Sequence, residues 1–151
     1  LGRWGYGGLH MSPAVHAVRQ NLDLIVDHGQ PASGLVHNWH ARWGSRKSQL
    51  EYVWRSAVGI DAHGRLLYVG GNMLTLQVLA NALVQAGAVR GMELDIHEDM
   101  VSANLFTPAH GATAAQHGGV TAEKLLPHMP RTARRYLQPD QRDFFTVTAR
   151  P

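Results

Sequence analysis

The fold is decided by residues 52–97, YVWRSAVGIDAHGRLLYVGGNMLTLQVLANALVQAGAVRGMELDIH, which predict two strands, a helix and a third strand. Residues 52–61 alternate loosely between apolar and polar side chains, as strands do. The turn-forming residues 61–64 then lead into a second strand over 65–70. This first half of the stretch therefore predicts a β-hairpin.

The second half of the stretch predicts a helix followed by a strand. Thr75 is a suitable N-cap, and residues 76–85 place Leu and Ala at helical i, i+3, i+4 and i+7 spacing. Gly87 occupies the position that commonly ends a helix, and residues 89–96 form the third strand. We expect an α+β fold, a mixed β-sheet with helices packed on one face.

Elements on the N-terminal side are short. Ser12 and the proline after it predict the start of a helix that runs to Arg19, and residues 22–26 predict a brief strand. Residues 30–49 lack periodicity and are expected to form a long loop. Two tryptophans in this loop argue against disorder.

Toward the C-terminus the pattern becomes irregular. We expect a second long loop over 107–120, a helical turn within 125–136 and a final strand over 144–149. No repeat or linker interrupts the chain, so residues 1–151 are expected to form a single domain portion.

Composition excludes several classes of protein. The 151 residues are 44% hydrophobic and 17% charged, which is unlike a disordered chain. The absence of cysteine excludes disulfide scaffolds and thiol catalysis. The net charge is +3, from 14 basic and 11 acidic residues. The basic residues are not concentrated on one predicted element, so a nucleic-acid partner is not expected. No apolar run approaches the roughly 20 residues of a transmembrane helix.

The sharpest chemical signal lies in the third strand. Glu93, Asp95 and His97 alternate along it, so they are expected to share one face at the end of a strand that follows a crossover helix. Two carboxylates about 6–7 Å apart can take different pKa values and act as acid and base. The apolar residues of the strand are expected to face the helix: Met92, Leu94 and Ile96.

Two other interpretations of this acidic row stay open. In the first alternative, the row is a solvated face of the sheet and Glu93 is paired with an arginine. Glu98 and Asp99 raise the local acidic density, and their carboxylates would suit a hard cation such as calcium, although the spacing is not that of an EF-hand. We therefore predict no required cofactor and keep a bound calcium ion as the alternative.

Further polar and aromatic residues are candidates for substrate binding. Arg55, within a packed strand, requires an anionic partner, either a carboxylate or a substrate phosphate. Arg19 and Asn21 either contact sugar hydroxyls or cap the helix end. Trp39, with His40 and Trp43 beside it, is a candidate sugar-stacking platform, and core packing is the alternative.

Short motifs in this order resemble the phosphodiester glycosidase family. They are Arg55-Ser56-Ala57-Val58-Gly59, Gly64-Arg65-Leu66-Leu67, Leu74-Thr75 with Leu79-Ala80, Gly87-Ala88, and Leu94-Asp95. The resemblance covers about residues 15–106 and is best over 54–97. The family includes the lysosomal enzyme that removes N-acetylglucosamine from a phosphodiester. Two further stretches are similar to the actinobacterial branch of that family: Arg19-Gln20-Asn21-Leu22 and Arg142-Asp143-Phe144-Phe145.

The resemblance implies a bacterial hydrolase, secreted or in the cell envelope, that cleaves a sugar-1-phosphodiester or a related glycosidic linkage. Asp95 falls on the family's acidic motif residue and Arg55 on its arginine. Many members follow the aspartate with Gly-Gly-Gly-Ser, whereas residues 96–99 here are Ile-His-Glu-Asp. By resemblance the chain is the C-terminal portion of a larger catalytic domain, so the N-terminal part of the same precursor is an expected partner. The alternative function is a non-catalytic carbohydrate-binding or structural subunit.

Overall fold

The chain forms two compact units in a computed structural model, residues 1–101 and residues 102–151. Two compact units are compatible with one folding domain, so the single-domain expectation remains a prediction. The structure describes residues 1–2, 10–15, 18, 21–108 and 119–148.

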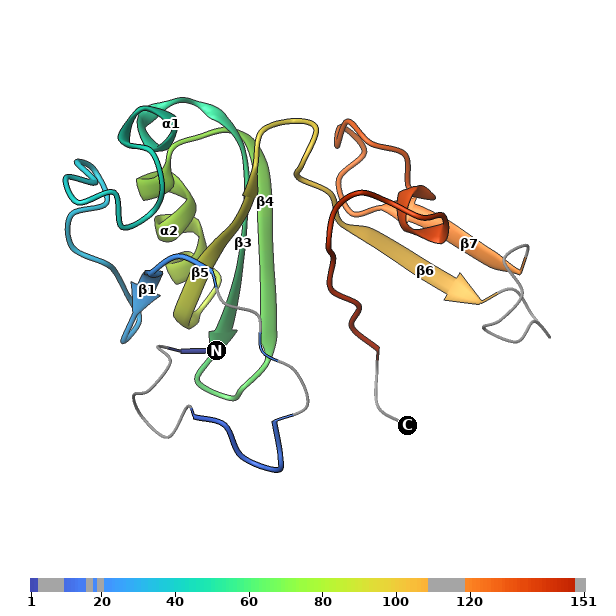
Figure 1. Cartoon of the computed structure of the whole chain (residues 1–151), viewed down its shortest axis with the longest axis horizontal. Coiled ribbons are helices and arrows are strands. Elements are labelled where there is room, and N and C mark those ends of the chain that lie inside the picture. The colour runs from blue at the N-terminus through green and yellow to red at the C-terminus, as the bar shows by residue number, and fades with distance from the viewer. Residues whose placement is uncertain (3–9, 16–17, 19–20, 109–118, 149–151) are drawn as a thin grey trace. The chain divides into compact units, whose positions relative to one another are not determined.

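A five-stranded sheet is the framework of the first unit (Figure 1). Its strand order is β2-β1-β5-β3-β4, and every neighbouring pair is antiparallel. β4 and β5 flank β3, so they run in the same direction, and α2 crosses over between them. This arrangement is the α+β fold that the sequence predicts. The elements are β1 (Leu24–Asp27), β2 (Gln30–Pro31), α1 (Arg46–Leu50), β3 (Val53–Asp61), β4 (Leu66–Leu74), α2 (Leu76–Gln85) and β5 (Ala88–Ile96).

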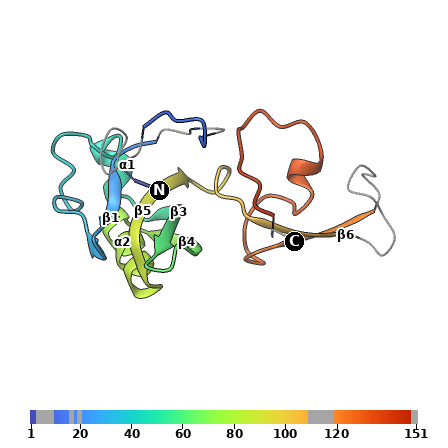
Figure 2. The same cartoon turned by 90° about the horizontal axis from the view of Figure 1, so that it is seen from below.

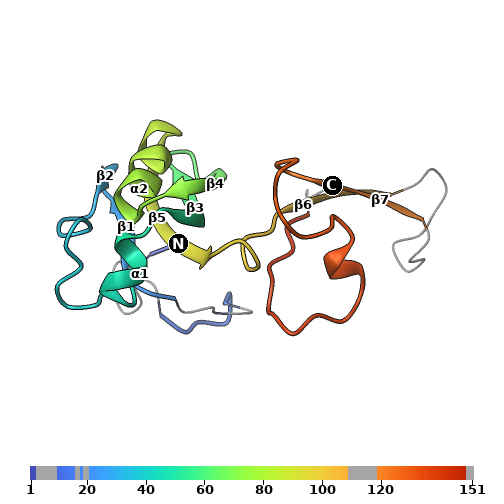
Figure 3. The same cartoon turned by 90° about the horizontal axis from the view of Figure 1, so that it is seen from above.

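Helix α2 covers one face of this sheet, as the views from below and from above show (Figures 2 and 3). The helix begins where predicted, because the Thr75 side chain accepts a hydrogen bond of 3.3 Å from the Val78 backbone N–H. It ends at Gly87, whose φ of +95° lies in the left-handed region. Its buried stripe is the predicted one: Leu76, Leu79, Ala80 and Leu83.

The helix lies close to the sheet because glycine occurs beneath it. A Cβ placed on Gly91 would lie 2.6 Å from Leu83 Cδ1, and one on Gly59 would lie 3.2 Å from Leu83 Cδ2. Bare backbone at these two positions lets Leu83 reach the sheet. The face of β5 that carries Gly91 is therefore the face under α2.

The predicted hairpin forms, and its second strand is longer than expected. β4 continues to Leu74, four residues beyond the predicted end of the strand at Gly70. The register shifts between the Arg55–Gly71 and Val53–Leu74 pairs, and Met73 has a φ of +57°. The strand thus absorbs the irregular residues as a bulge instead of stopping.

Other boundaries differ at the ends of this unit. Ser12 to Val15 form a turn closed by a 2.9 Å backbone hydrogen bond. Most of the predicted helix after it lies outside the described residues. The segment 30–49 is loop for most of its length, although it begins with β2 and ends in α1.

The second unit is a hairpin with a short 3-10 turn. β6 (Asn104–Pro108) pairs antiparallel with β7 (Val120–Lys124), and η1 covers Arg135–Leu137. Neither strand is predicted from the sequence. They extend into both ends of the expected loop 107–120, of which residues 109–118 lie outside the described part.

The predicted strand over 144–149 is wrong for its described residues. Residues 144–148 have no strand structure. An alternating pattern forms a strand only when a neighbouring backbone pairs with it. Here Phe145 and Val147 are exposed, and Phe144 instead lies with its ring 4.6 Å from that of Tyr136.

Candidate functional site

The face assignment predicted for the acidic row is wrong. Glu93 is only 3% exposed and lies on the helix side of the sheet, on the same face as Ala57, which pairs with it. Arg55, two residues before Ala57, pairs with Ile96, three residues after Glu93. Glu93 faces α2 because Gly91, two residues earlier on β5, does so too. The bulge lies beyond Glu93 and puts Ile96 on the same face, so period-two counting fails between these two residues.

Arg55 and Glu93 form an ion pair in the interior of the first unit. Arg55 Nη1 lies 2.7 Å from Glu93 Oε1, and the exposed fractions of the two side chains are 0% and 3%. Gln49 bridges them, since its Oε1 accepts from Arg55 Nη1 at 2.7 Å and its Nε2 donates to Glu93 Oε2 at 3.0 Å. Of the two partners weighed from the sequence for Arg55, the structure shows a carboxylate.

The remaining Arg55 donors bind the backbone. Nε donates to the Leu74 carbonyl at 2.7 Å, and Nη2 donates to the Glu51 carbonyl at 3.1 Å. The guanidinium thus ties β3, β4 and the end of α1 together. Desolvation raises the pKa of Glu93 above its usual value, while the hydrogen bonds from Arg55 and Gln49 oppose that shift.

Asp95 lies next to this buried network without being sealed in it. Its residue is half-buried, and its backbone carbonyl accepts a 2.9 Å hydrogen bond from Ser56 Oγ. Asn21 reaches the same strand, because its Nδ2 donates to the Glu93 carbonyl at 2.6 Å. Arg19, the other residue of that predicted polar cluster, lies outside the described residues.

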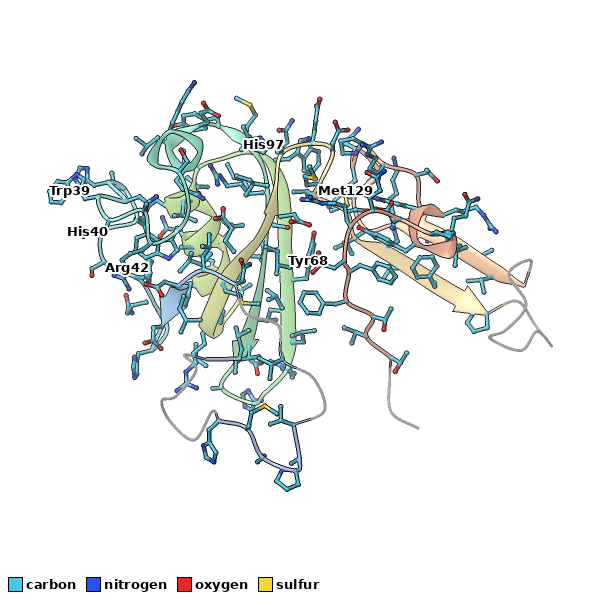
Figure 4. The ribbon with its side chains drawn as sticks, viewed as in Figure 1. Trp39, His40, Arg42, Tyr68, His97 and Met129 are labelled. Atoms are coloured by element: carbon cyan, nitrogen blue, oxygen red, sulfur yellow. The ribbon has the colours of Figure 1, made fainter. Side chains whose placement is uncertain are left out.

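His97 follows β5 in an exposed turn (Figure 4). Its φ is +74°, and its backbone N–H donates to the Trp54 carbonyl at 2.8 Å. Its own carbonyl accepts from the amides of Met100 and Val101, each at 3.1 Å. The imidazole is therefore presented to solvent from a hydrogen-bonded turn.

The two tryptophans of the predicted stacking platform have different environments. Trp43 is 1% exposed, and its Nε1 donates to the carbonyls of Asp23 and Leu24 at 3.1 and 3.2 Å. Trp39 is 71% exposed and stacks on His37, with ring centroids 4.8 Å apart. Trp43 is thus a core anchor, and Trp39 alone presents an aromatic surface.

A pocket of about 120 Å³ opens beside Trp39. Figure 4 shows Trp39, His40 and Arg42 on the loop at one side of the first unit, well away from His97. The pocket is lined by Ser33, Gly34, His37, Trp39, His40, Arg42 and Trp43.

Gln49 is the main residue of the buried network that the sequence analysis missed. It is 3% exposed in the short helix α1, and its Nε2 also donates to the Trp43 carbonyl. A five-residue helix gives no periodic signal, so only tertiary contacts reveal this role. The pocket-lining His37 is adjacent to the expected aromatic cluster, and the density of ring and guanidinium side chains over 37–43 is the signal that points to it.

Neither a metal cluster nor a membrane span is found within the part of the chain that the structure describes. There, no group of three or more His, Asp or Glu side chains is arranged to hold a metal ion. None of its helices is both long enough and apolar enough to cross a bilayer.

Comparison with known proteins gives a structural neighbour and no family. No protein-family model matches the chain, and no curated protein matches it. The crystal structure of a hypothetical protein from Synechocystis is similar over 52% of this chain, with 25% sequence identity and a TM-score of 0.43. The similar region spans 15% of that protein.

Proposed function

We propose that this protein contributes to hydrolysis of a sugar-1-phosphodiester linkage, with Asp95 as the carboxylate at the reacting atoms. The observation that supports it is the meeting of residues from separate motifs of the phosphodiester glycosidase resemblance. Ser56 Oγ holds the Asp95 carbonyl at 2.9 Å, and Arg55 pairs with Ile96. These residues are about forty positions apart in the sequence, yet they lie together at the end of β5.

Arg55 and Glu93 act as positioning residues in this proposal. The guanidinium is fully buried and already donates to a carboxylate, an amide and two carbonyls. The Glu93 carboxylate is equally enclosed, so neither group meets a substrate in this arrangement. Together with Gln49 they fix the strand end from which Asp95 and His97 emerge.

The chemistry needs little acid assistance. Water attacks the anomeric carbon, the bond from that carbon to the phosphate oxygen breaks, and the phosphate monoester leaves as a stable anion. Asp95 accepts a proton from the attacking water or orients it. The exposed imidazole of His97 is the second proton-transfer group in this proposal.

The wider setting is part of the same proposal. Asn21, which binds β5, would support the substrate side of the site. We place the protein in the cell envelope or outside a bacterial cell, where phosphodiester-linked sugars occur in glycans, and we expect another part of the precursor to complete the site.

Asp95→Asn tests the proposal. Release of N-acetylglucosamine from its 1-phosphate methyl ester should fall by about 10²–10⁴-fold, the usual contribution of a general acid or base. Asp99→Asn, in the exposed turn after His97, is the matched control and should keep the activity. Both variants should melt like the parent. Both are tested in the whole precursor that contains this chain: an inactive parent precursor, or full activity in its Asp95→Asn variant, would refute the assignment.

A further inference from the structure

We propose that the pocket beside Trp39 binds a single neutral sugar ring, stacked on the indole. This site is separate from Asp95, and the proposal does not depend on the hydrolytic function. Its residues come from the loop between β2 and α1, at the side of the first unit opposite His97 (Figure 4).

Trp39 provides the stacking surface. An indole that is 71% exposed leaves a large apolar area in water, which favours a ligand that covers it. His37 backs the ring at a centroid distance of 4.8 Å and an interplanar angle of 19°. The stack holds the indole in one orientation, so ligand binding costs little side-chain entropy. The axial C–H groups of a sugar ring suit such a flat face.

Charge favours a neutral ligand over an anion. Arg42 is a cation that lines the pocket, but its Nε lies 2.6 Å from Asp23 Oδ2, which neutralises it. Its guanidinium also lies over the Trp43 ring, with Cζ 4.8 Å from the centroid. Within the described part of the chain, its terminal nitrogens have no hydrogen-bond acceptor. They remain donors for hydroxyl groups, while a phosphate or carboxylate would meet the Asp23 charge nearby.

The size of the pocket selects one ring. A buried water needs about 10–15 Å³ by this measure, so 120 Å³ has room for roughly ten water molecules. Sites for drug-sized ligands are larger, about 300–1,000 Å³. The pocket therefore fits a monosaccharide unit, either free or at the end of a glycan.

The loop is held in shape before any ligand arrives. Asn38 Nδ2 donates to the Gly44 carbonyl at 2.9 Å, and Asn38 Oδ1 accepts from the Trp43 N–H at 3.2 Å. Asn38 itself has a φ of +42°, a conformation that asparagine tolerates better than most residues. Because the buried Trp43 anchors this turn, the pocket on its outer side is preformed.

The test is a ligand titration of the whole 151-residue chain. The probes are methyl glycosides of glucose, galactose and N-acetylglucosamine, with glucose 1-phosphate and glucuronate as anions. The readout is the dissociation constant from isothermal titration calorimetry in the parent and every variant, with the indole N–H resonance of Trp39 in two-dimensional NMR locating the site in the parent. At least one neutral glycoside should shift this resonance saturably, and should bind more tightly than either anion.

Variants separate stacking from general effects. Trp39→Ala should weaken binding by about tenfold or more, as loss of an aromatic anchor does, while Trp39→Phe should stay within a few-fold of the parent. Tyr52→Ala removes another exposed aromatic and should leave binding unchanged. No saturable shift with any neutral glycoside, tighter binding of an anion, or equal binding by Trp39→Ala would overturn the proposal. Asp95→Asn should bind the glycosides as tightly as the parent does. The binding test can therefore succeed even if the proposed hydrolytic function fails.

Discussion

Arg55 Nη1 and Glu93 Oε1 are 2.7 Å apart in the interior of the first unit, although 38 positions separate the two residues in the sequence. A buried pair of this kind is tolerated because Gln49 and two backbone carbonyls satisfy the rest of its hydrogen-bonding groups. The relationship explains why a strand with an acidic residue at its centre packs under an apolar helix.

Breaking this pair from one side should be costly. Glu93→Gln leaves the Arg55 charge buried without a carboxylate, and we expect the free energy of unfolding to fall by about 3–5 kcal/mol. Chemical denaturation of the parent and of Glu93→Gln measures this difference in the free energy of unfolding.

The matched control replaces both partners. Arg55→Met with Glu93→Leu removes both charges, and this double variant should be more stable than the sum of the single changes implies. Additive losses would show that the two groups do not act as a pair.

Gly91→Ala should destabilise the first unit. The added Cβ would lie 2.6 Å from Leu83 Cδ1, so the helix must move or the leucine must change its rotamer. Overpacking of this kind costs about 1–3 kcal/mol, measured as a loss of unfolding free energy. Adding Leu83→Val should restore part of the loss; if it adds a further independent loss, the contact is not the cause.

Thr75→Ala should weaken the start of α2. The Thr75 hydroxyl accepts from the Val78 N–H, and loss of an N-cap oxygen costs about 0.5–2 kcal/mol. Thermal unfolding followed by circular dichroism measures this cost. Thr75→Ser keeps the oxygen and serves as the control, so a serine variant as unstable as the alanine variant would contradict the cap.

Asp140 in the second unit should titrate in strong acid. Hydrogen bonds from the Arg135 side chain and the Arg142 backbone lower its pKa from 3.8 to about 2. A carboxyl whose pKa is lower in the folded state stabilises the fold above pH 3.8, and this contribution is lost as the pH falls toward about 2. NMR titration of the carboxyl carbon measures the pKa.

Arginine variants identify the cause of this shift. Arg135→Gln should move the Asp140 pKa upward toward 3.8, because it removes the side-chain hydrogen bond at 2.7 Å. Arg131→Gln removes only a weaker charge effect and should change the pKa less. An equal response to both substitutions would point to general charge and not to the hydrogen bond.

Local patterns in the sequence were enough to predict the central elements. The hairpin, the helix capped at Thr75 and ended at Gly87, and the strand that follows depend on turn chemistry and helical spacing between near neighbours. The composition of the loop over 30–49 likewise indicated Trp39 and Trp43 as candidates for a stacking platform, without distinguishing between them. Such signals involve residues only a few positions apart, so they can be recognised in the sequence without knowledge of tertiary contacts.

Only the tertiary structure decided which groups meet. The choice of the β5 face that packs under α2, the role of Gln49, and the burial of Trp43 beside the exposed Trp39 all depend on contacts between distant segments. The β6–β7 hairpin and the missing strand after residue 144 have the same origin, because a strand exists only where another backbone completes its hydrogen bonds. Period-two alternation groups Gly91 with Glu93, but it does not say which face of the strand meets the helix, and the bulge beyond Glu93 then breaks the alternation.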